Sequence, residues 1–141
     1  MSAWRKEASE RLPELQRIIA SREVDSPMML WIELNLEFER RCKQEPVPIE
    51  LLKRLWGYAK WCMGRGDDVG TGAALGFCEH LIDTKESRSV LPKIMSRQDY
   101  LDLKPLLLYH NSEPDYEEVL KGFKTVAMKP KRKKYPNTLD S

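Results

Sequence analysis

The stretch VGTGAALGFCEHLI, residues 69–82, constrains the fold more than any other part of the chain. Its first ten residues, 69–78, carry no charge and include three glycines. On a helical wheel residues 69–82 leave no polar face, and a helix that is apolar all round is covered by its neighbours. Each interior glycine costs a helix about 0.5–1 kcal/mol relative to alanine, and close approach of a neighbouring backbone or bulky side chain is the expected compensation. The stretch predicts a buried central helix at about residues 68–82.

The rest of the chain also has helical patterns, punctuated by proline and small polar residues. Ser26-Pro27 is an N-cap followed by proline at the first helical position, and Thr84 and Ser96 are expected to cap later helices. No segment has the alternation and β-branched enrichment of a strand. We therefore predict an all-α fold, an irregular compact bundle of six to seven helices around the central one. The expected helices cover about residues 13–21, 27–43, 49–63, 68–82, 84–92, 96–109 and a last segment from residue 112.

Length and composition favour one domain with two extensions. A chain of 141 residues with 41% hydrophobic and 33% charged residues is typical of a single globular domain. We assign residues 1–11 to an N-terminal arm, 12–124 to the helical domain and 125–141 to a basic tail that is expected to be disordered. Five basic residues and one acidic residue give the tail a net charge of +4, so the remainder of the +2 chain carries −2.

Cysteine usage and hydropathy indicate a compartment. Cys42, Cys62 and Cys78 cannot all pair within one molecule and form no Cys-x-x-Cys motif, so we expect buried, reduced thiols. The first residues show no apolar segment of a secretory signal. The longest uncharged run is far short of the ~20 residues that span a membrane. These features predict a cytoplasmic protein without membrane association.

Glu79 and His80 end the apolar stretch and are the first candidates for chemistry. A buried charge must be paired or neutralised, which leaves two interpretations open. In the first, Glu79 and His80, with Asp68 as a further catalytic candidate, form an acid–base pair or polar pocket. In the second, which we favour, Glu79, His80 and Asn35 form a closed structural network. There His80 bonds to a carboxylate or a backbone carbonyl, and Glu79 pairs with an arginine such as Arg40. Possible partners in the first interpretation are Asp67, Glu33, Asn35 and His110, and Arg41 is the alternative to Arg40 in the second.

No metal or cofactor is predicted. Cys78 and His80 are two residues apart, which on a helix separates them by about 160°, whereas zinc needs converging ligands. The glycines of GRGDDVGTGAALG (64–76) lack the lysine and hydroxyl residue of a P-loop and the preceding strand of a dinucleotide fingerprint.

Two groups of residues suggest a partner. Trp61 projects from the polar side of its helix and Trp4 lies in the arm, so each either contacts a partner or is covered by the rest of the chain. The tail offers cations that could contact nucleic-acid phosphates, but the folded body is slightly acidic and a solubilising role is favoured. These cations are Lys131, Arg132, Lys133 and Lys134.

Four short motifs carry a resemblance: LWIEL (30–34), YAKWC (58–62), GFCEHL (76–81) and LLYH (107–110). On these motifs the chain resembles a group of small bacterial helical proteins that have no established activity. The similarity covers most of residues 12–124. The resemblance implies a bacterial, intracellular, all-helical domain and carries no function with it.

Three classes of function follow. The absence of a catalytic constellation favours a non-enzymatic protein-interaction module of a regulatory or toxin-neutralising type. The alternatives are a small enzyme or ligand-binding domain that uses Glu79 and His80, and a nucleic-acid accessory protein that acts through the tail. A solvent-reachable pocket lined by Glu79 and His80 would favour the enzyme, and a closed interior with a paired histidine would favour the interaction module.

Overall fold

The computed structural model describes residues 2–132, with side chains for residues 2–123. Within these residues the chain forms nine α-helices, two short 3-10 helices and no strand, so the all-α prediction is confirmed. The number exceeds the expected six to seven because the N-terminal arm is helical and the segment 96–109 forms two helices. The 3-10 helices are η1 (Pro13–Leu15) and η2 (Cys78–His80). The α-helices are α1 (Ala3–Arg11), α2 (Gln16–Ile19), α3 (Pro27–Cys42), α4 (Ile49–Arg65), α5 (Asp68–Gly76), α6 (Lys85–Ile94), α7 (Arg97–Asp102), α8 (Lys104–Leu107) and α9 (Glu113–Arg132).

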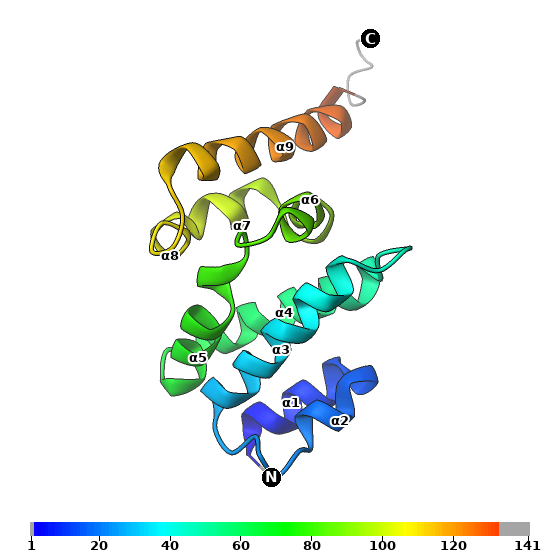
Figure 1. The fold of residues 1–141 in the computed structure, drawn as a ribbon, viewed down its shortest axis with the longest axis vertical. Helices are drawn as coiled ribbons and strands as arrows, with labels where there is room; N and C mark the ends of the chain where they lie inside the picture. Colours follow the sequence, from blue (N-terminus) through cyan, green and yellow to red (C-terminus); the bar gives the residue numbers. More distant parts are fainter. Residues whose placement is uncertain (1, 133–141) are drawn as a thin grey trace.

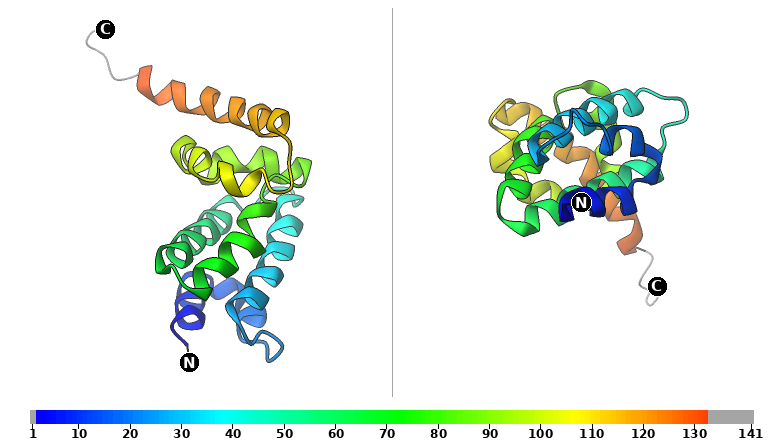
Figure 2. Two further views of the ribbon diagram at one scale, coloured as in Figure 1. Left: turned by 90° about the vertical axis from the view of Figure 1, so that its left-hand side faces the viewer. Right: turned by 90° about the horizontal axis from the view of Figure 1, so that it is seen from below.

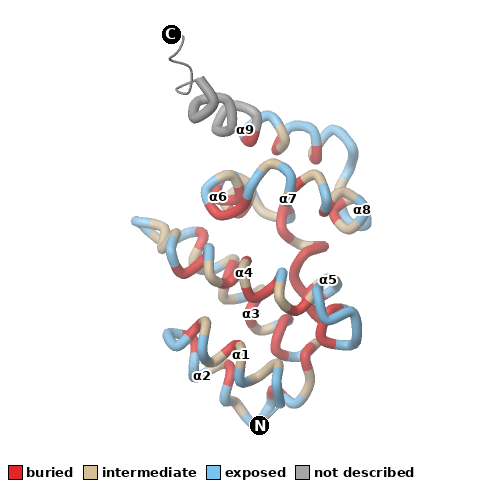
Figure 3. The backbone as a smooth tube through the Cα atoms, turned by 180° about the vertical axis from the view of Figure 1, so that it is seen from behind, coloured by how far each residue is buried: buried red, intermediate tan, exposed pale blue. Residues whose placement is uncertain are grey.

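The helices stack in tiers along the long axis of the molecule (Figure 1). α1 and α2 lie at the end that holds the N-terminus, and α3, α4 and α5 form the next tier (Figures 1 and 2). α6, α7 and α8 follow, and α9 covers the far end. Buried residues lie on the sides of the helices that face a neighbouring tier, so one hydrophobic core runs along the molecule (Figure 3).

The helix predicted to be central is α5, which packs against both α3 and α4. Asp67 caps its first turn by accepting a hydrogen bond from the Val69 amide at 3.0 Å. The predicted end at residue 82 is wrong, because α5 ends at Gly76 and the chain continues into η2. The helix stops where the buried Phe77 leaves helical geometry, with φ −131° and ψ −60°. One stripe of α5 is exposed, so its neighbours cover most of its surface and not all of it; the stripe consists of Asp68, Thr71 and Leu75.

The glycines of α5 allow the close approach that the sequence predicted. A Cβ atom on Gly72 would lie 3.0 Å from the carbonyl carbon of Pro27 in α3, and one on Gly70 would lie 3.1 Å from the carbonyl oxygen of Cys62 in α4. On Gly76 it would lie 2.9 Å from the Cβ atom of Trp31. All three contacts are tighter than ordinary packing around a side chain, so α5 sits against both neighbours at backbone distance.

The N-terminal arm belongs to the domain, because residues 3–11 form α1, which packs on α4. Ala8 of α1 is fully buried, and the Tyr58 hydroxyl of α4 donates a hydrogen bond to the Trp4 carbonyl oxygen at 2.7 Å. The Arg5 guanidinium donates to the carbonyl oxygens of Ile19 and Val24, which holds α1 against the segment after α2.

The C-terminal half begins after η2. Ser96 and Asp99 form the expected capping box at the start of α7, and Pro105 lies in the first turn of α8. α9 packs on α6 and α7, where the Tyr100 ring stacks on Tyr116 with centroids 4.8 Å apart. Residues 125–132 of the predicted tail continue α9, and residues 133–141 lie outside the described residues. No helix in the described part of the chain has the length and apolar character needed to cross a membrane.

Candidate functional site

The η2 turn brings Glu79 and His80 to the end of α8, where His110 follows the helix. The His80 and His110 rings stack with their centroids 4.8 Å apart and their planes 16° apart. The chain has only these two histidines. Two segments thirty residues apart therefore bring every imidazole of the protein into one place.

Each histidine pairs with a carboxylate. His110 Nε2 lies 3.0 Å from Glu79 Oε1, and His80 Nδ1 lies 2.8 Å from Asp83 Oδ2. An ionised carboxylate only accepts hydrogen bonds, so the ring nitrogen is the donor in both contacts. The Asn111 amide donates to the other Asp83 oxygen at 3.4 Å. We call Glu79, His80, Asp83 and His110 the histidine–carboxylate cluster.

The cluster extends from the core to the surface. Glu79 is the one charged residue that is buried among the described residues, with 10% of its side chain exposed. The His80 and Asp83 side chains are about one-third exposed, and that of His110 is 45% exposed. Removing a charge from water costs several kcal/mol unless a partner compensates it. His110 is the partner that compensates Glu79.

The cluster matches the network interpretation of Glu79 and His80 only in part. His80 is bonded to a carboxylate, as the network interpretation expects, but Glu79 pairs with His110 and not with an arginine. Arg40 and Arg41 both bind Glu37 instead. None of the three clefts described for the structure is lined by Glu79 or His80, so the solvent-reachable pocket expected of an enzyme is not found at these clefts.

Other residues that the sequence grouped with Glu79 lie elsewhere. Asp68 is exposed at the opposite end of α5, and Asp67 caps that helix. Asn35 lies on α3, where its buried Oδ1 atom forms no hydrogen bond with a described residue. Glu33 lines a cleft between α2 and α3. The predicted network of Asn35 with Glu79 and His80 is therefore not formed.

Sequence reasoning did not single out Asp83 and gave His110 only as a possible partner. The helical wheel assumed that residues 78–82 continue α5, whereas the break at Phe77 changes the direction of every later side chain. His110 comes from a separate helix end, and no local pattern links it to His80. The one available signal was that the chain has only two histidines.

Glu79, His80 and His110 have the donor types of a metal site. One possible ligand atom from each lies within 4.8 Å of those of the other two. Cys78 does not take part, because its thiol is buried and contacts the Met63 sulfur at 3.7 Å. Burial raises the pKa of Cys78, so this thiol stays protonated and unreactive.

Trp61 and Trp4 are both partly covered by their own chain. The Trp61 ring stacks on Tyr58 with centroids 6.0 Å apart, and the Arg65 guanidinium lies 5.2 Å from its centre. The Trp4 ring is half-buried, with the Arg5 guanidinium 4.8 Å from its centre. Both rings pack against the hydrophobic core and keep part of their surface exposed.

A row of exposed apolar side chains lies on α3 instead. Met29, Ile32 and Leu36 are exposed by 37%, 42% and 57%, and their spacing places them on one side of the helix. Two other large apolar side chains are exposed among the described residues, Leu75 on α5 and Tyr109 after α8. We call Met29, Ile32 and Leu36 the α3 stripe.

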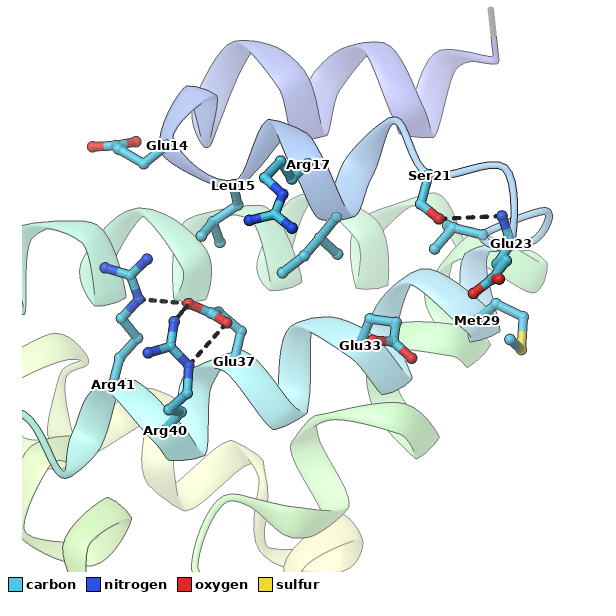
Figure 4. Close-up of a pocket in the computed structure, with 12 residues that line it drawn as sticks. Glu14, Leu15, Arg17, Ser21, Glu23, Met29, Glu33, Glu37, Arg40 and Arg41 are labelled. Atoms are coloured by element: carbon cyan, nitrogen blue, oxygen red, sulfur yellow. Dashed lines mark hydrogen bonds and ion pairs between the residues drawn. The ribbon is translucent and has the colours of Figure 1, made fainter.

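A cleft of about 380 Å³ lies beside the α3 stripe, between α2 and α3 (Figure 4). Met29 lines one end, and Arg40 and Arg41 bind Glu37 near the other. Burial opposes ionisation of Glu37, but hydrogen bonds from the two arginines outweigh it and lower its pKa. Arg17 reaches from α2 toward the α3 side of the cleft (Figure 4).

The remaining sequence candidates belong to the basic tail. Lys131 and Arg132 fall on the last turn of α9, where side chains are not described, and Lys133 and Lys134 lie outside the described residues.

The chain matches no family model, no curated protein and no solved structure in comparisons with known proteins. Function is therefore inferred from the cluster, the α3 stripe and the cleft.

Proposed function

We propose that the chain is a non-enzymatic protein-interaction module and that the α3 stripe is its contact surface. The observation that carries the proposal is the alignment of Met29, Ile32 and Leu36 at positions i, i+3 and i+7 of one helix. Scattered exposed apolar residues are ordinary, but a row with helical spacing is the surface on which a partner helix packs.

The cleft beside the stripe defines the chemistry of the partner. Arg17, Glu23 and Glu33 line it and form no ion pair with any side chain in residues 2–123, so they are available to charges on another molecule. Glu14 and Glu37, in contrast, are held by arginines of the chain itself. The partner that fits is an amphipathic helix with an apolar stripe and flanking charges of both signs. A regulatory protein or a toxin that is neutralised could present such a helix.

A cytoplasmic location is part of the proposal. The three cysteines are free and buried, and no two of them form a disulfide. Reduced, buried thiols are typical of proteins kept in a reducing compartment.

The test is to replace the apolar stripe by charge. An Ile32→Asp/Leu36→Asp variant and the wild type are used to capture partners from the native cell, and the captured protein is then titrated in purified form. Both side chains are exposed, so the substitutions should change the free energy of unfolding by only about 0.5 kcal/mol each. We expect the variant to bind the purified partner at least about ten-fold more weakly.

Tyr109→Asp is the matched control, because it also places a carboxylate on an exposed, large apolar residue but lies off α3. This variant should bind as the wild type does. A photoreactive residue at position 36 should cross-link to the partner. Equal binding by the stripe variant would refute the contact surface, and a wild type without any stoichiometric partner would refute the interaction function. A cross-link between two copies of the chain would show self-association instead.

A ligand-binding or enzymatic role is the second candidate, and the histidine–carboxylate cluster favours it. A nucleic-acid role through the tail is the third. Deleting residues 129–141 tests that role, because phosphate contacts make affinity strongly dependent on salt. The role is eliminated if the full chain has no affinity for DNA or RNA, or if the deletion leaves its affinity unchanged.

A further inference from the structure

Beyond this interaction function, we propose that the histidine–carboxylate cluster binds a divalent transition-metal ion of the zinc class. Glu79, His80 and His110 supply one ligand each, and Asp83 positions the His80 ring. A coordination position remains for a water molecule.

The donor set fits such an ion. Two imidazoles and one carboxylate suit zinc and its neighbours in the first transition row, and magnesium and calcium prefer oxygen ligands alone. Zinc–ligand bonds of about 2.0–2.2 Å place tetrahedral ligand atoms roughly 3.3 Å apart. The His110 Nε2 to Glu79 Oε1 distance is already 3.0 Å. One possible ligand atom of each residue lies within 4.8 Å of those of the other two, so a movement of one ring has to bring them to bonding distance.

Asp83 fixes the form of His80 that a metal requires. Because Nδ1 donates its proton to the Asp83 carboxylate at 2.8 Å, the lone pair of the neutral ring is on Nε2. A carboxylate that holds the second nitrogen of a ligating histidine is the usual support of such sites, since it sets the ring orientation and makes the ligand more basic. Asn111 in turn donates to the second Asp83 oxygen, which steadies the carboxylate.

Glu79 gains from the ion because it is a buried anion. Its present partner, His110, is a neutral donor or a cation according to its protonation state, and the ring is 45% exposed. A divalent ion between Glu79 and His110 takes the place of the proton that they share, and the neutral His110 ring then carries its proton on Nδ1. The buried carboxylate is thereby paired with a full positive charge at bonding distance.

The stacked rings must separate when the ion binds. A metal ion lies near the plane of each imidazole that ligates it. Two rings whose planes differ by 16° and whose centroids are 4.8 Å apart cannot both point their lone pairs at one ion. His110 is the ring that turns, because it lies in the exposed segment after α8 and Glu79 and His80 are held by η2. Loss of the His80–His110 stack is therefore a direct signature of binding.

The experiment uses the full chain, stripped with a chelator and titrated with Zn²⁺ by calorimetry and with Co²⁺ by visible absorption. The variants are Glu79→Gln, Asp83→Asn and His110→Ala, and Asp102→Asn is the matched control, since it changes an exposed carboxylate outside the cluster. Circular dichroism checks that each variant is folded. His110 is largely exposed, so its variant tests the site even if Glu79→Gln destabilises the domain.

We expect one Zn²⁺ per chain, with affinity reduced at least about ten-fold in Glu79→Gln and His110→Ala and about 10–100-fold in Asp83→Asn. Asp102→Asn should bind as the wild type does. The Co²⁺ complex should absorb in the visible without a thiolate band, and NMR signals from both imidazoles should shift. A wild type that binds no Zn²⁺ at millimolar concentration overturns the proposal, as do unchanged affinities in all cluster variants or a thiolate band from Co²⁺. The Ile32→Asp/Leu36→Asp variant should bind Zn²⁺ as the wild type does. Failure of the metal site and failure of the proposed interaction function can therefore be distinguished.

Discussion

Gly76→Ala tests the close packing of α5 on α3. The added Cβ would lie 2.9 Å from Trp31 Cβ, whereas ordinary contacts begin at 3.4 Å. Trp31 Cβ is bonded directly to the backbone of α3 and cannot rotate away, so the two helices must separate by about 0.5 Å. Overpacking of this kind lowers the free energy of unfolding by about 1–3 kcal/mol. Because the contact would be shorter than 3 Å, we expect a loss near the upper end of that range for Gly76→Ala. Alanine recovers at most about 1 kcal/mol of helix propensity, so the net loss is about 2 kcal/mol.

The assay is urea unfolding together with a thermal melt. About 4 °C per kcal/mol applies to a chain of this size, so the Tm should fall by roughly 8 °C. Gly64→Ala is the matched control, because Gly64 lies near the end of α4 and has no atom within 4 Å of the added Cβ. This variant should gain about 0.5–1 kcal/mol from helix propensity alone. The packing argument fails if Gly76→Ala is as stable as the wild type while Gly64→Ala shows its gain.

Two further predictions concern ionisable groups. A hydrogen bond from Arg54 holds the pKa of Glu14 at about 2, below its ordinary value of 4.5. The ion pair therefore contributes its full stability above pH 4.5 and loses it as the pH falls toward 2. Because the pair is exposed, Glu14→Gln should lower the free energy of unfolding by less than about 1 kcal/mol at pH 7, and by a smaller amount at pH 3. If urea unfolding shows the same loss at both pH values, the ion pair is not the source of the pH dependence. Burial raises the pKa of Cys42 to about 12 and raises that of Cys78 as well, so a thiol reagent should label the native chain very slowly and all three cysteines after unfolding in guanidinium. Rapid labelling of the native chain would show that the thiols are accessible.

The parts of the fold that depend on local chemistry could be predicted from sequence. Ser26, Thr84 and Ser96 were expected to cap helices, and each accepts a hydrogen bond from an amide in the following turn. A cap depends on a side chain and on backbone within three residues of it, so the sequence contains the whole interaction. The close contact at the α5 glycines was predictable for a similar reason. A glycine has no side chain, so the sequence alone shows where a neighbour can approach the helix backbone, whichever neighbour that is.

The parts that depend on distant partners could not be predicted in this way. α1 has one fully buried residue, Ala8, and a charged surface elsewhere, so its periodicity is weak and its packing on α4 supplies the order. α5 ends at Gly76 because Phe77 enters an aromatic cluster with Trp31 and Phe38, with centroids 4.9 and 5.1 Å away. The meeting of His80 and His110 follows from that break and from the position of α8, neither of which has a local signal.

The seating of α5 between α3 and α4 has a consequence for how the chain reaches its native state. α4 and α5 are consecutive in the chain, so their contacts close only a short loop, and local contacts of this kind are associated with rapid folding. The contacts of α5 with Pro27 and Trp31 of α3 join residues 45 positions apart, so they close a longer loop. α1 packs on α4, and α9 packs on α6 and α7, of which α6 contacts α4 in turn, so both ends dock after this pair has formed. α4 and α5 are thus the natural nucleus, onto which α3 and both ends of the protein assemble.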